Sequence, residues 1–171
     1  MKIELPNIEI EKKYIVRKPC EKELSEMPEY TRSEITQIYL KSPASITRRI
    51  RSRERSGNIT YTETTKVRID KMSAYEDERE ISCEEFEMLS SEMDEKTQPI
   101  IKTRHTFVYE GQLFEIDIYP EWKSTAIMET ELESRDKDVI FPKIITILRE
   151  VTGDKNYSNA GMSRSFPDED K

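Results

Sequence analysis

The sequence is poor in the residues on which several common kinds of site depend. Its 171 residues include one histidine, two cysteines and four glycines. A single histidine and no close cysteine pair leave too few nitrogen and sulfur ligands for a zinc site. The scarcity of glycine argues against a phosphate-binding P-loop or a dinucleotide-binding glycine pattern. No Ser/His/Asp arrangement for nucleophilic catalysis is apparent either.

Long apolar runs are also missing, since no stretch approaches the roughly 18 apolar residues of a membrane-spanning helix. The two cysteines, Cys20 and Cys83, and the lack of a signal peptide lead us to expect a cytoplasmic protein with free thiols. A net charge of −7 is unlike that of a general nucleic-acid-binding protein. Neither a nucleic acid nor a membrane is therefore an expected partner.

Charge, by contrast, is abundant and regularly placed. Charged residues make up 37% of the chain and hydrophobic residues 35%. In residues 8–16, Glu9, Glu11 and Lys13 occupy odd-numbered positions, and most even-numbered positions are apolar. This alternation has the period of a β-strand. Disordered chains lack this alternation. We expect one domain over residues 1–171, with a frayed tail at about 163–171.

The pattern of strands and turns predicts an α+β fold that is mainly β and antiparallel, with about three helices. Turns at Ser56–Asn58 and Glu110–Gly111 predict two hairpins. A helix is expected over 83–94, starting near Ser82, and another from Pro142 through 151. The other predicted elements are strands at 8–16, 34–41, 46–55, 59–69, 74–81, 99–109, 112–119 and 125–134, and a short helix or loop at 19–30.

The charged faces of these strands are sorted by sign. Arg49, Arg51 and Arg53 share one face of their strand, and Glu129 and Glu131 share a face of another. A solvated sheet face explains any one strand, but solvated faces usually mix signs because neighbouring like charges repel. Cationic strands facing anionic ones indicate a closed cavity. A divalent cation bound to the carboxylates and a polyanion bound to the Arg and Lys side chains would neutralise the charges of such a cavity. Carboxylate oxygens are ligands that suit Mg²⁺ or Mn²⁺.

An ordered set of motifs resembles the CYTH superfamily, the triphosphate tunnel metalloenzymes. The resemblance covers about residues 7–162 and implies an eight-stranded antiparallel β-barrel, open as a tunnel, with a charged interior and helices packed outside. The motifs in chain order are EIEKK at 9–13, RIR at 49–51, Lys66, an E-x-E at 76–78, KTR at 102–104, FEIDIY at 114–119, ETE at 129–131 and EVTGDKNYSN at 150–159.

The resemblance also implies roles for single residues. Asp117 would orient Arg104 or a metal-bound water, and Lys13 would hold phosphate or bridge carboxylates. The implied metal ligands, for Mg²⁺ or Mn²⁺, are Glu9, Glu11, Glu129 and Glu131. The implied triphosphate ligands are Lys13, Arg49, Arg51, Lys66, Lys102, Arg104 and Lys155. The implied catalytic residues are Glu9, Glu11, Lys13 and Asp117, with Glu76, Glu78 and Arg53 as further candidates.

Three functions remain open from the sequence. The first is a metal-dependent phosphohydrolase acting on inorganic tripolyphosphate, or on a nucleoside or thiamine triphosphate. The second is a class IV-type adenylate cyclase, for which Tyr39, Tyr61 or Trp122 would form the adenine pocket. The third is a non-catalytic polyphosphate or nucleotide sensor. A homodimer is compatible with each. Two departures from the family pattern, His105 and Asn156, would alter substrate fit.

Overall fold

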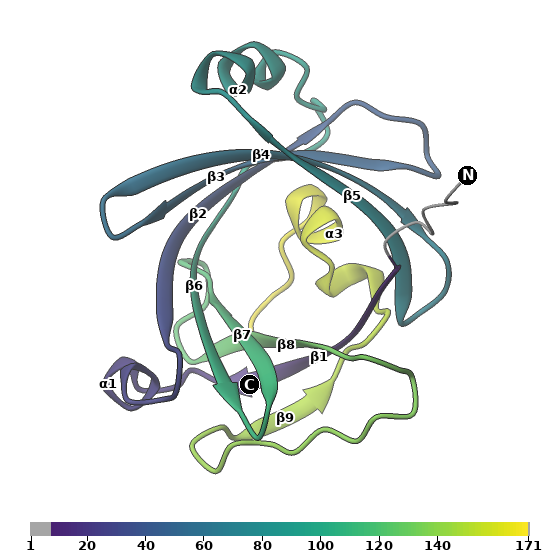
Figure 1. The fold of residues 1–171 in the computed structure, drawn as a ribbon. Coiled ribbons are helices and arrows are strands. Elements are labelled where there is room, and N and C mark those ends of the chain that lie inside the picture. The colour runs from purple at the N-terminus through teal and green to yellow at the C-terminus, as the bar shows by residue number, and fades with distance from the viewer. Residues whose placement is uncertain (1–7, 171) are drawn as a thin grey trace, which may run out of the picture.

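The computed structural model describes residues 8–170, and the elements below belong to that part of the chain (Figure 1). None of its helices is long and apolar enough to cross a membrane. The elements in chain order are β1 (Ile8–Arg17), α1 (Glu21–Ser25), β2 (Thr31–Leu40), β3 (Thr47–Arg55), β4 (Asn58–Arg68), β5 (Ser73–Ile81), α2 (Cys83–Ser90), β6 (Ile100–Tyr109), β7 (Gln112–Ile118), β8 (Thr125–Glu131), β9 (Ile147–Glu150), the 3-10 helix η1 (Lys155–Tyr157) and α3 (Asn159–Arg164).

Strands β1 to β8 close into an antiparallel barrel, which appears as a ring of strands in Figure 1. Hydrogen bonding runs in the order β5-β4-β3-β2-β6-β7-β8-β1, and β1 then returns to β5. The closure depends on β1, whose residues Ile8–Ile10 pair with β5 while Glu11–Arg17 pair with β8. The predicted eight-stranded barrel and the mainly β, α+β fold class are confirmed.

Both predicted hairpins are present, and their turns explain the residues found there. Ser56 and Gly57 connect β3 to β4, and Glu110 and Gly111 connect β6 to β7. All four residues have positive φ angles, between 49° and 82°. Two-residue turns of this kind match the right-handed twist of the strands, and glycine adopts their second position without a steric cost. Each turn therefore fixes the register of its two strands.

The outward faces of the barrel carry apolar residues, as expected. Tyr14, Val16, Phe107, Phe114 and Met128 form one buried cluster over β1, β6, β7 and β8, covered by α1 and the segment before β9. The second helix, α2, covers a smaller cluster on β2, β3 and β5. This helix begins after Ser82, whose Oγ accepts a hydrogen bond from the backbone N–H of Glu85 at 3.1 Å. Its predicted start is therefore correct, although it ends at Ser90.

The helix predicted from Pro142 to 151 is wrong. The structure has irregular chain followed by β9, which pairs antiparallel with the second half of β1. The pairing of β1 with β5 ends at Ile10, so the backbone N–H and C=O groups on that edge of the second half of β1 need another partner. Strand β9 (Ile147–Glu150) supplies these bonds, and next to it the carbonyl of Thr146 accepts from the backbone N–H of Arg17 and the N–H of Val151 donates to the carbonyl of Lys13. An open strand edge therefore overrides the helical spacing of the apolar residues.

One end of the barrel interior is apolar. A second cluster, here called the apolar floor, combines inward-facing strand residues with side chains from η1 and α3. In Figure 1 these two helices lie across the opening of the ring of strands. The apolar floor comprises Ile15, Tyr39, Ile100, Tyr119, Trp122, Ile127, Val151, Tyr157 and Met162. Charge therefore occupies only part of the interior.

The chain end differs from the expectation of a frayed tail at 163–171. Phe166 packs edge-on against Tyr119 and Trp122, and the Trp122 Nε1–H donates to the carbonyl of Pro167 at 3.0 Å. The carboxylate of Glu169 accepts hydrogen bonds from the backbone N–H groups of residues 123, 124 and 125. These contacts hold residues 163–170 against the apolar floor, and Lys171 lies outside the described residues.

Removing residues 166–171 is expected to lower stability. Losing a packed aromatic side chain costs about 3 kcal/mol, which corresponds to a fall of roughly 6–12 °C in Tm for a chain of this size. Thermal unfolding monitored by circular dichroism measures the effect. Asp168→Ala is the matched control, because Asp168 is exposed and takes no part in the contacts of Phe166, Pro167 and Glu169. Equal Tm values for the full-length and shortened chains would contradict this role of the tail.

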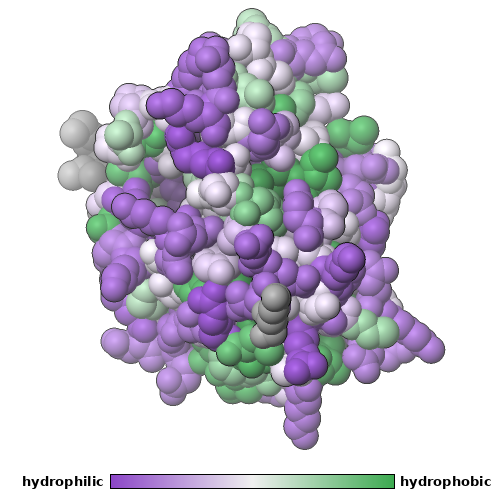
Figure 2. Space-filling view, turned by 180° about the vertical axis from the view of Figure 1, so that it is seen from behind, coloured by the Kyte–Doolittle hydropathy of each residue, from purple (hydrophilic) through white to green (hydrophobic). Residues whose placement is uncertain are grey.

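One face of the molecule is largely hydrophilic. On the face in Figure 2, hydrophilic residues predominate and apolar residues form small separate groups. Cys20 and Cys83 are both free and exposed, as expected from the sequence. The cytoplasmic location and the homodimer stay predictions.

Candidate functional site

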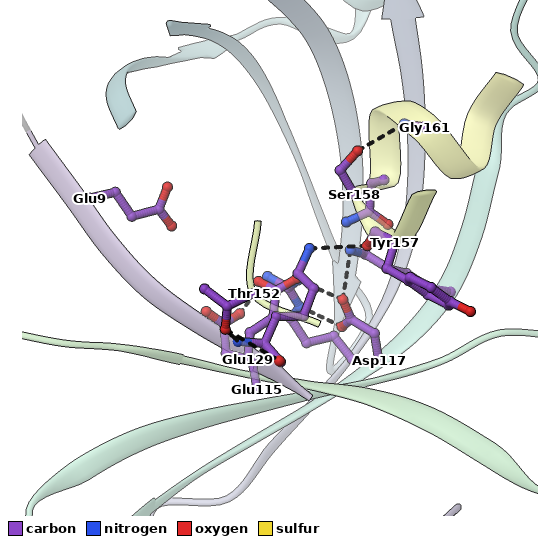
Figure 3. Close-up of polar contacts among 12 residues, drawn as sticks. Glu9, Glu115, Asp117, Glu129, Thr152, Tyr157, Ser158 and Gly161 are labelled. Carbon is purple, nitrogen blue, oxygen red and sulfur yellow. Dashed lines mark hydrogen bonds and ion pairs between the residues drawn. The ribbon is translucent and has the colours of Figure 1, made fainter. Parts of the chain in front are cut away.

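A cavity of about 1040 Å³ occupies the charged part of the barrel interior. It is here called the lumen cavity. Glu9 on β1 points into this space, apart from the dense polar contacts around Asp117 and Glu129 (Figure 3). The predicted site residues that line it are Glu9, Glu11, Lys13, Arg49, Arg51, Arg53, Lys66, Glu76, Glu78, Arg104, Glu129, Glu131 and Lys155. Strand parity therefore placed most of the predicted side chains on the correct face.

The order of strands around the barrel separates the charges into two halves. Strands β5, β1, β8 and β7 are consecutive neighbours and carry carboxylates, while β4, β3 and β6 carry cations, with uncharged inward positions on β2 between them. The acidic half comprises Glu76, Glu78, Glu9, Glu11, Glu129, Glu131 and Glu115. The basic half comprises Lys66, Arg49, Arg51, Arg53 and Arg104. The sorting by sign seen along the sequence thus becomes two facing walls.

The centre of the acidic half is a crowded set of carboxylates. Glu11 lies directly opposite Glu131 in the pairing of β1 with β8. Burial raises the pKa of Glu11 to about 7, and the carboxylate of Glu129 adds to this rise. Burial and the neighbouring Glu9 also raise the pKa of Glu131. These carboxylates have fewer cationic partners than they need, so bringing a positive charge among them would be favourable.

Lys13 and Lys66 supply part of that positive charge. Lys13 Nζ lies 3.2 Å from Glu129 and donates to the carbonyl of Tyr157 at 3.2 Å. Lys66 Nζ lies 3.1 Å from Glu9 and 3.7 Å from Glu76. Lys13 thus contacts one carboxylate among the described residues, and its two expected roles stay predictions. The hydrogen bond from Lys13 to the carbonyl of Tyr157 also connects β1 to η1.

The acidic half fits a hard divalent cation that shares its ligands with a substrate. Among the described residues, no group of three or more Asp, Glu, His or Cys side chains is arranged to hold a metal ion alone. Mg²⁺ commonly takes one or two carboxylates and completes its shell with water and phosphate oxygens. The opposed pair Glu11 and Glu131, with raised pKa values, is suited to that mode.

The basic half presents donors that the protein itself does not satisfy. Within residues 8–170, the buried Nε atoms of Arg49 and Arg53 have no hydrogen-bond partner. Arg49 reaches Glu76 only at 3.9 Å. Unpaired buried guanidinium groups are costly unless a ligand completes them. Phosphate oxygens match their fork of N–H donors.

Behind the wall of the cavity lies a buried cluster of Lys102, Arg104 and Asp117. Asp117 accepts two hydrogen bonds from Arg104, at 2.7 and 2.8 Å, and one from Lys102 at 2.8 Å. Although burial favours its protonated form, these cations hold the pKa of Asp117 well below its usual range. Burial, with Arg104 beside it, lowers the pKa of Lys102 to about 7.

Neither Lys102 nor Asp117 lines the lumen cavity, and each side chain is at most 1% exposed. In this arrangement Asp117 orients Arg104, one of its two expected roles, and does not reach a water in the cavity. Lys102 neutralises Asp117 and presents no donor to a ligand there. Their positions in the alternating strands correctly predicted that both side chains point into the barrel. The alternation could not show how far along the barrel they lie, which is next to the apolar floor.

Other sequence candidates lie away from the cavity. His105 is buried on the outer side, where its Nδ1 pairs with the hydroxyl of Tyr30 at 2.7 Å. Tyr61 packs against α2, and Trp122 belongs to the apolar floor. Asn156 is exposed in η1 and does not line the cavity. Among the aromatic residues suggested for an adenine pocket, only Tyr39 lines the cavity.

Two residues to which the sequence motifs assigned no role contact cations of the basic half. Glu115 lines the cavity and forms an ion pair with Arg104. Gln37, on β2, accepts two hydrogen bonds from Arg51. Glu115 shares its parity with Asp117, so the alternation was a usable signal. Gln37 also has the inward parity of its strand, but an uncharged residue does not stand out in a search for charged faces.

A closed antiparallel barrel with an acidic and a basic wall defines a class of protein suited to holding a cation beside a polyanion. The chain belongs to the CYTH domain family, whose model matches residues 7–165.

Two curated relatives are named inorganic triphosphatase. This chain is 30% identical to the relative from Acetivibrio thermocellus, and the match covers 92% of this chain and 94% of the relative. It is 32% identical to the relative from Nitrosomonas europaea, and the match covers 93% of this chain and 99% of the relative. A crystal structure of an inorganic triphosphatase superposes with a TM-score of 0.57 at 30% identity, covering 93% of this chain and 96% of that one. A protein from Pyrococcus horikoshii shares the fold, with a TM-score of 0.58 at 23% identity. The match covers 75% of this chain and 80% of that one.

Proposed function

We propose that this protein is a metal-dependent inorganic triphosphatase that hydrolyses tripolyphosphate in the lumen cavity. The observation that carries the proposal is the pair of facing walls, one with crowded carboxylates and one with unpaired guanidinium donors. The names of the two curated relatives and of the matching crystal structure support it. A small, highly charged substrate also agrees with the lining of the cavity, in which Tyr39 is the one aromatic residue within the part of the chain that the structure describes.

In this proposal the basic half binds the phosphates. Arg49, Arg51 and Arg53 donate to phosphate oxygens, and Arg104 is oriented for the same task by Asp117. Lys66 and Lys155, which line the cavity, add positive charge to its lining. Neutralising the charge that spreads over the transferred phosphoryl group is the main requirement of phosphoryl transfer.

The acidic half would hold Mg²⁺ or Mn²⁺ through Glu9, Glu11, Glu129 and Glu131. The bound ion would draw charge from the phosphate oxygens and bring the substrate against this wall. A carboxylate of this half orients the attacking water and accepts its proton. Water adds to a terminal phosphorus, the bond to the bridging oxygen breaks, and orthophosphate and pyrophosphate leave.

The test is release of orthophosphate and pyrophosphate from tripolyphosphate and from ATP, with Mg²⁺ and then Mn²⁺, together with an assay for cyclic AMP. We expect orthophosphate from tripolyphosphate at least about tenfold faster than from ATP, and none after chelation with EDTA. Cyclic AMP with an equal amount of pyrophosphate would instead establish the cyclase. Tight binding of tripolyphosphate without turnover would indicate the sensor.

A further inference from the structure

Arg51 and Arg104 are the buried cations of the basic half that line the lumen cavity, and the protein holds them in different ways. Arg104 is bound by the carboxylates of Asp117 and Glu115, and Lys66 is bound by Glu9 and Glu76. Arg51 is 7% exposed and lines the lumen cavity, yet among the described residues no carboxylate forms an ion pair with it.

Its partner is the neutral side chain of Gln37. The two residues are directly opposite in the pairing of β2 with β3. The Oε1 of Gln37 accepts hydrogen bonds from Arg51 Nε at 2.9 Å and Nη2 at 2.6 Å. Gln37 is fully buried, and its amide nitrogen donates to the hydroxyl of Tyr39 at 3.4 Å. Gln37, held in turn by Tyr39 on the same strand, therefore fixes the guanidinium of Arg51 in one orientation.

The choice of an amide has an electrostatic consequence. A carboxylate at this place would satisfy the same donors and would also cancel the positive charge. An amide satisfies the donors but leaves the charge in place, although burial beside Arg49 lowers the pKa of Arg51 to about 9. The remaining N–H groups of Arg51 stay available to a ligand in the cavity. A buried cation without an anionic partner is costly for the protein and attractive to an anion.

We propose that Gln37 is a positioning residue that aims Arg51 at a phosphate group of the substrate while keeping the guanidinium charge uncompensated. This inference rests on the proposed triphosphatase function. It treats Arg51 as a buried cation whose charge no ion pair among the described residues compensates. It also makes the neutrality of Gln37 a condition for substrate affinity.

The test is Gln37→Glu, which keeps the shape and both acceptor contacts and adds only a negative charge. We expect Tm in EDTA to stay the same or rise, because the carboxylate now pairs with Arg51. Affinity for tripolyphosphate, measured by titration calorimetry in EDTA, should fall about ten- to a hundredfold, and its dependence on salt should weaken. With metal present, KM should rise by a similar factor while kcat changes less.

Gln98→Glu is the matched control, because Gln98 is exposed and does not line the cavity. A second variant, Gln37→Met, is neutral but has no strong acceptor; it should also bind more weakly, since Arg51 loses its orientation. Should Gln37→Glu fail to fold, unchanged affinity in Gln37→Met would overturn the proposal. A folded Gln37→Glu protein that binds tripolyphosphate as the wild type does would overturn it directly.

The binding measurement separates this inference from the proposed function, because it needs no turnover. A wild-type protein that binds tripolyphosphate without hydrolysing it, together with weakened binding by Gln37→Glu, would support the role of Gln37 and reject the triphosphatase. Hydrolysis by the wild type with an unchanged KM in Gln37→Glu would support the triphosphatase and reject the role of Gln37.

Discussion

Glu11→Gln is expected to reduce the hydrolysis of tripolyphosphate by about a hundredfold or more while leaving the barrel folded. Glu11 faces Glu131 across the strand pair, and burial raises its pKa to about 7. Removing one preplaced charge from a site of this kind commonly costs 10²–10³ in kcat. Because the substitution relieves repulsion among carboxylates, Tm in EDTA should be equal to that of the wild type or higher.

Metal binding gives a second measurement on the same variant. A ligand that binds only the folded state raises Tm by mass action, so Mg²⁺ or Mn²⁺ should raise the Tm of the wild type and have little effect on Glu11→Gln. Glu133→Gln is the control, because Glu133 is exposed just beyond β8 and does not line the cavity. Wild-type activity together with a wild-type metal shift in Glu11→Gln would remove Glu11 from the metal-binding set.

Asp117→Asn is expected to destabilise the protein by about 3–5 kcal/mol, the usual cost of leaving buried cations without their partner. Asp117 is the shared acceptor for Arg104 and Lys102, and it is 1% exposed. Lys102, whose pKa already lies near 7, would lose its proton, whereas Arg104 would stay charged and lose its orientation. Unfolding in urea measures the stability loss, and KM for tripolyphosphate reports the loss of orientation.

A double variant separates charge from packing in this cluster. Lys102→Met combined with Asp117→Asn removes one buried cation along with the anion, so it should recover part of the lost stability. Asp77→Asn is the matched single control, because Asp77 is exposed on β5. A free energy of unfolding for Asp117→Asn within about 1 kcal/mol of the wild type, the value typical of exposed ion pairs, would contradict the role of the cluster.

The sequence indicated the strands and their charged faces because alternation along a strand is a local property, whereas the barrel followed from the resemblance to the CYTH superfamily. The side chains of Glu9, Glu11 and Lys13 point the same way whatever the rest of the chain does. Turn residues with positive φ, such as Gly57 and Gly111, likewise fix hairpins through local sterics. The failed helix before Val151 shows the limit of this reasoning, since only the open edge of β1 made a strand preferable there.

Parity by itself determined which side chains face the interior, including the acidic Glu129 and the basic Arg51. Only the tertiary structure decided their depth and their partners. The apolar floor places Lys102 and Asp117 behind the cavity wall rather than in it. Strand order sets neutral Gln37 against Arg51 and gathers the carboxylates of four strands on one wall. These relations join residues far apart in the chain, and they arise only when the barrel closes, because closure is what brings distant strands into register.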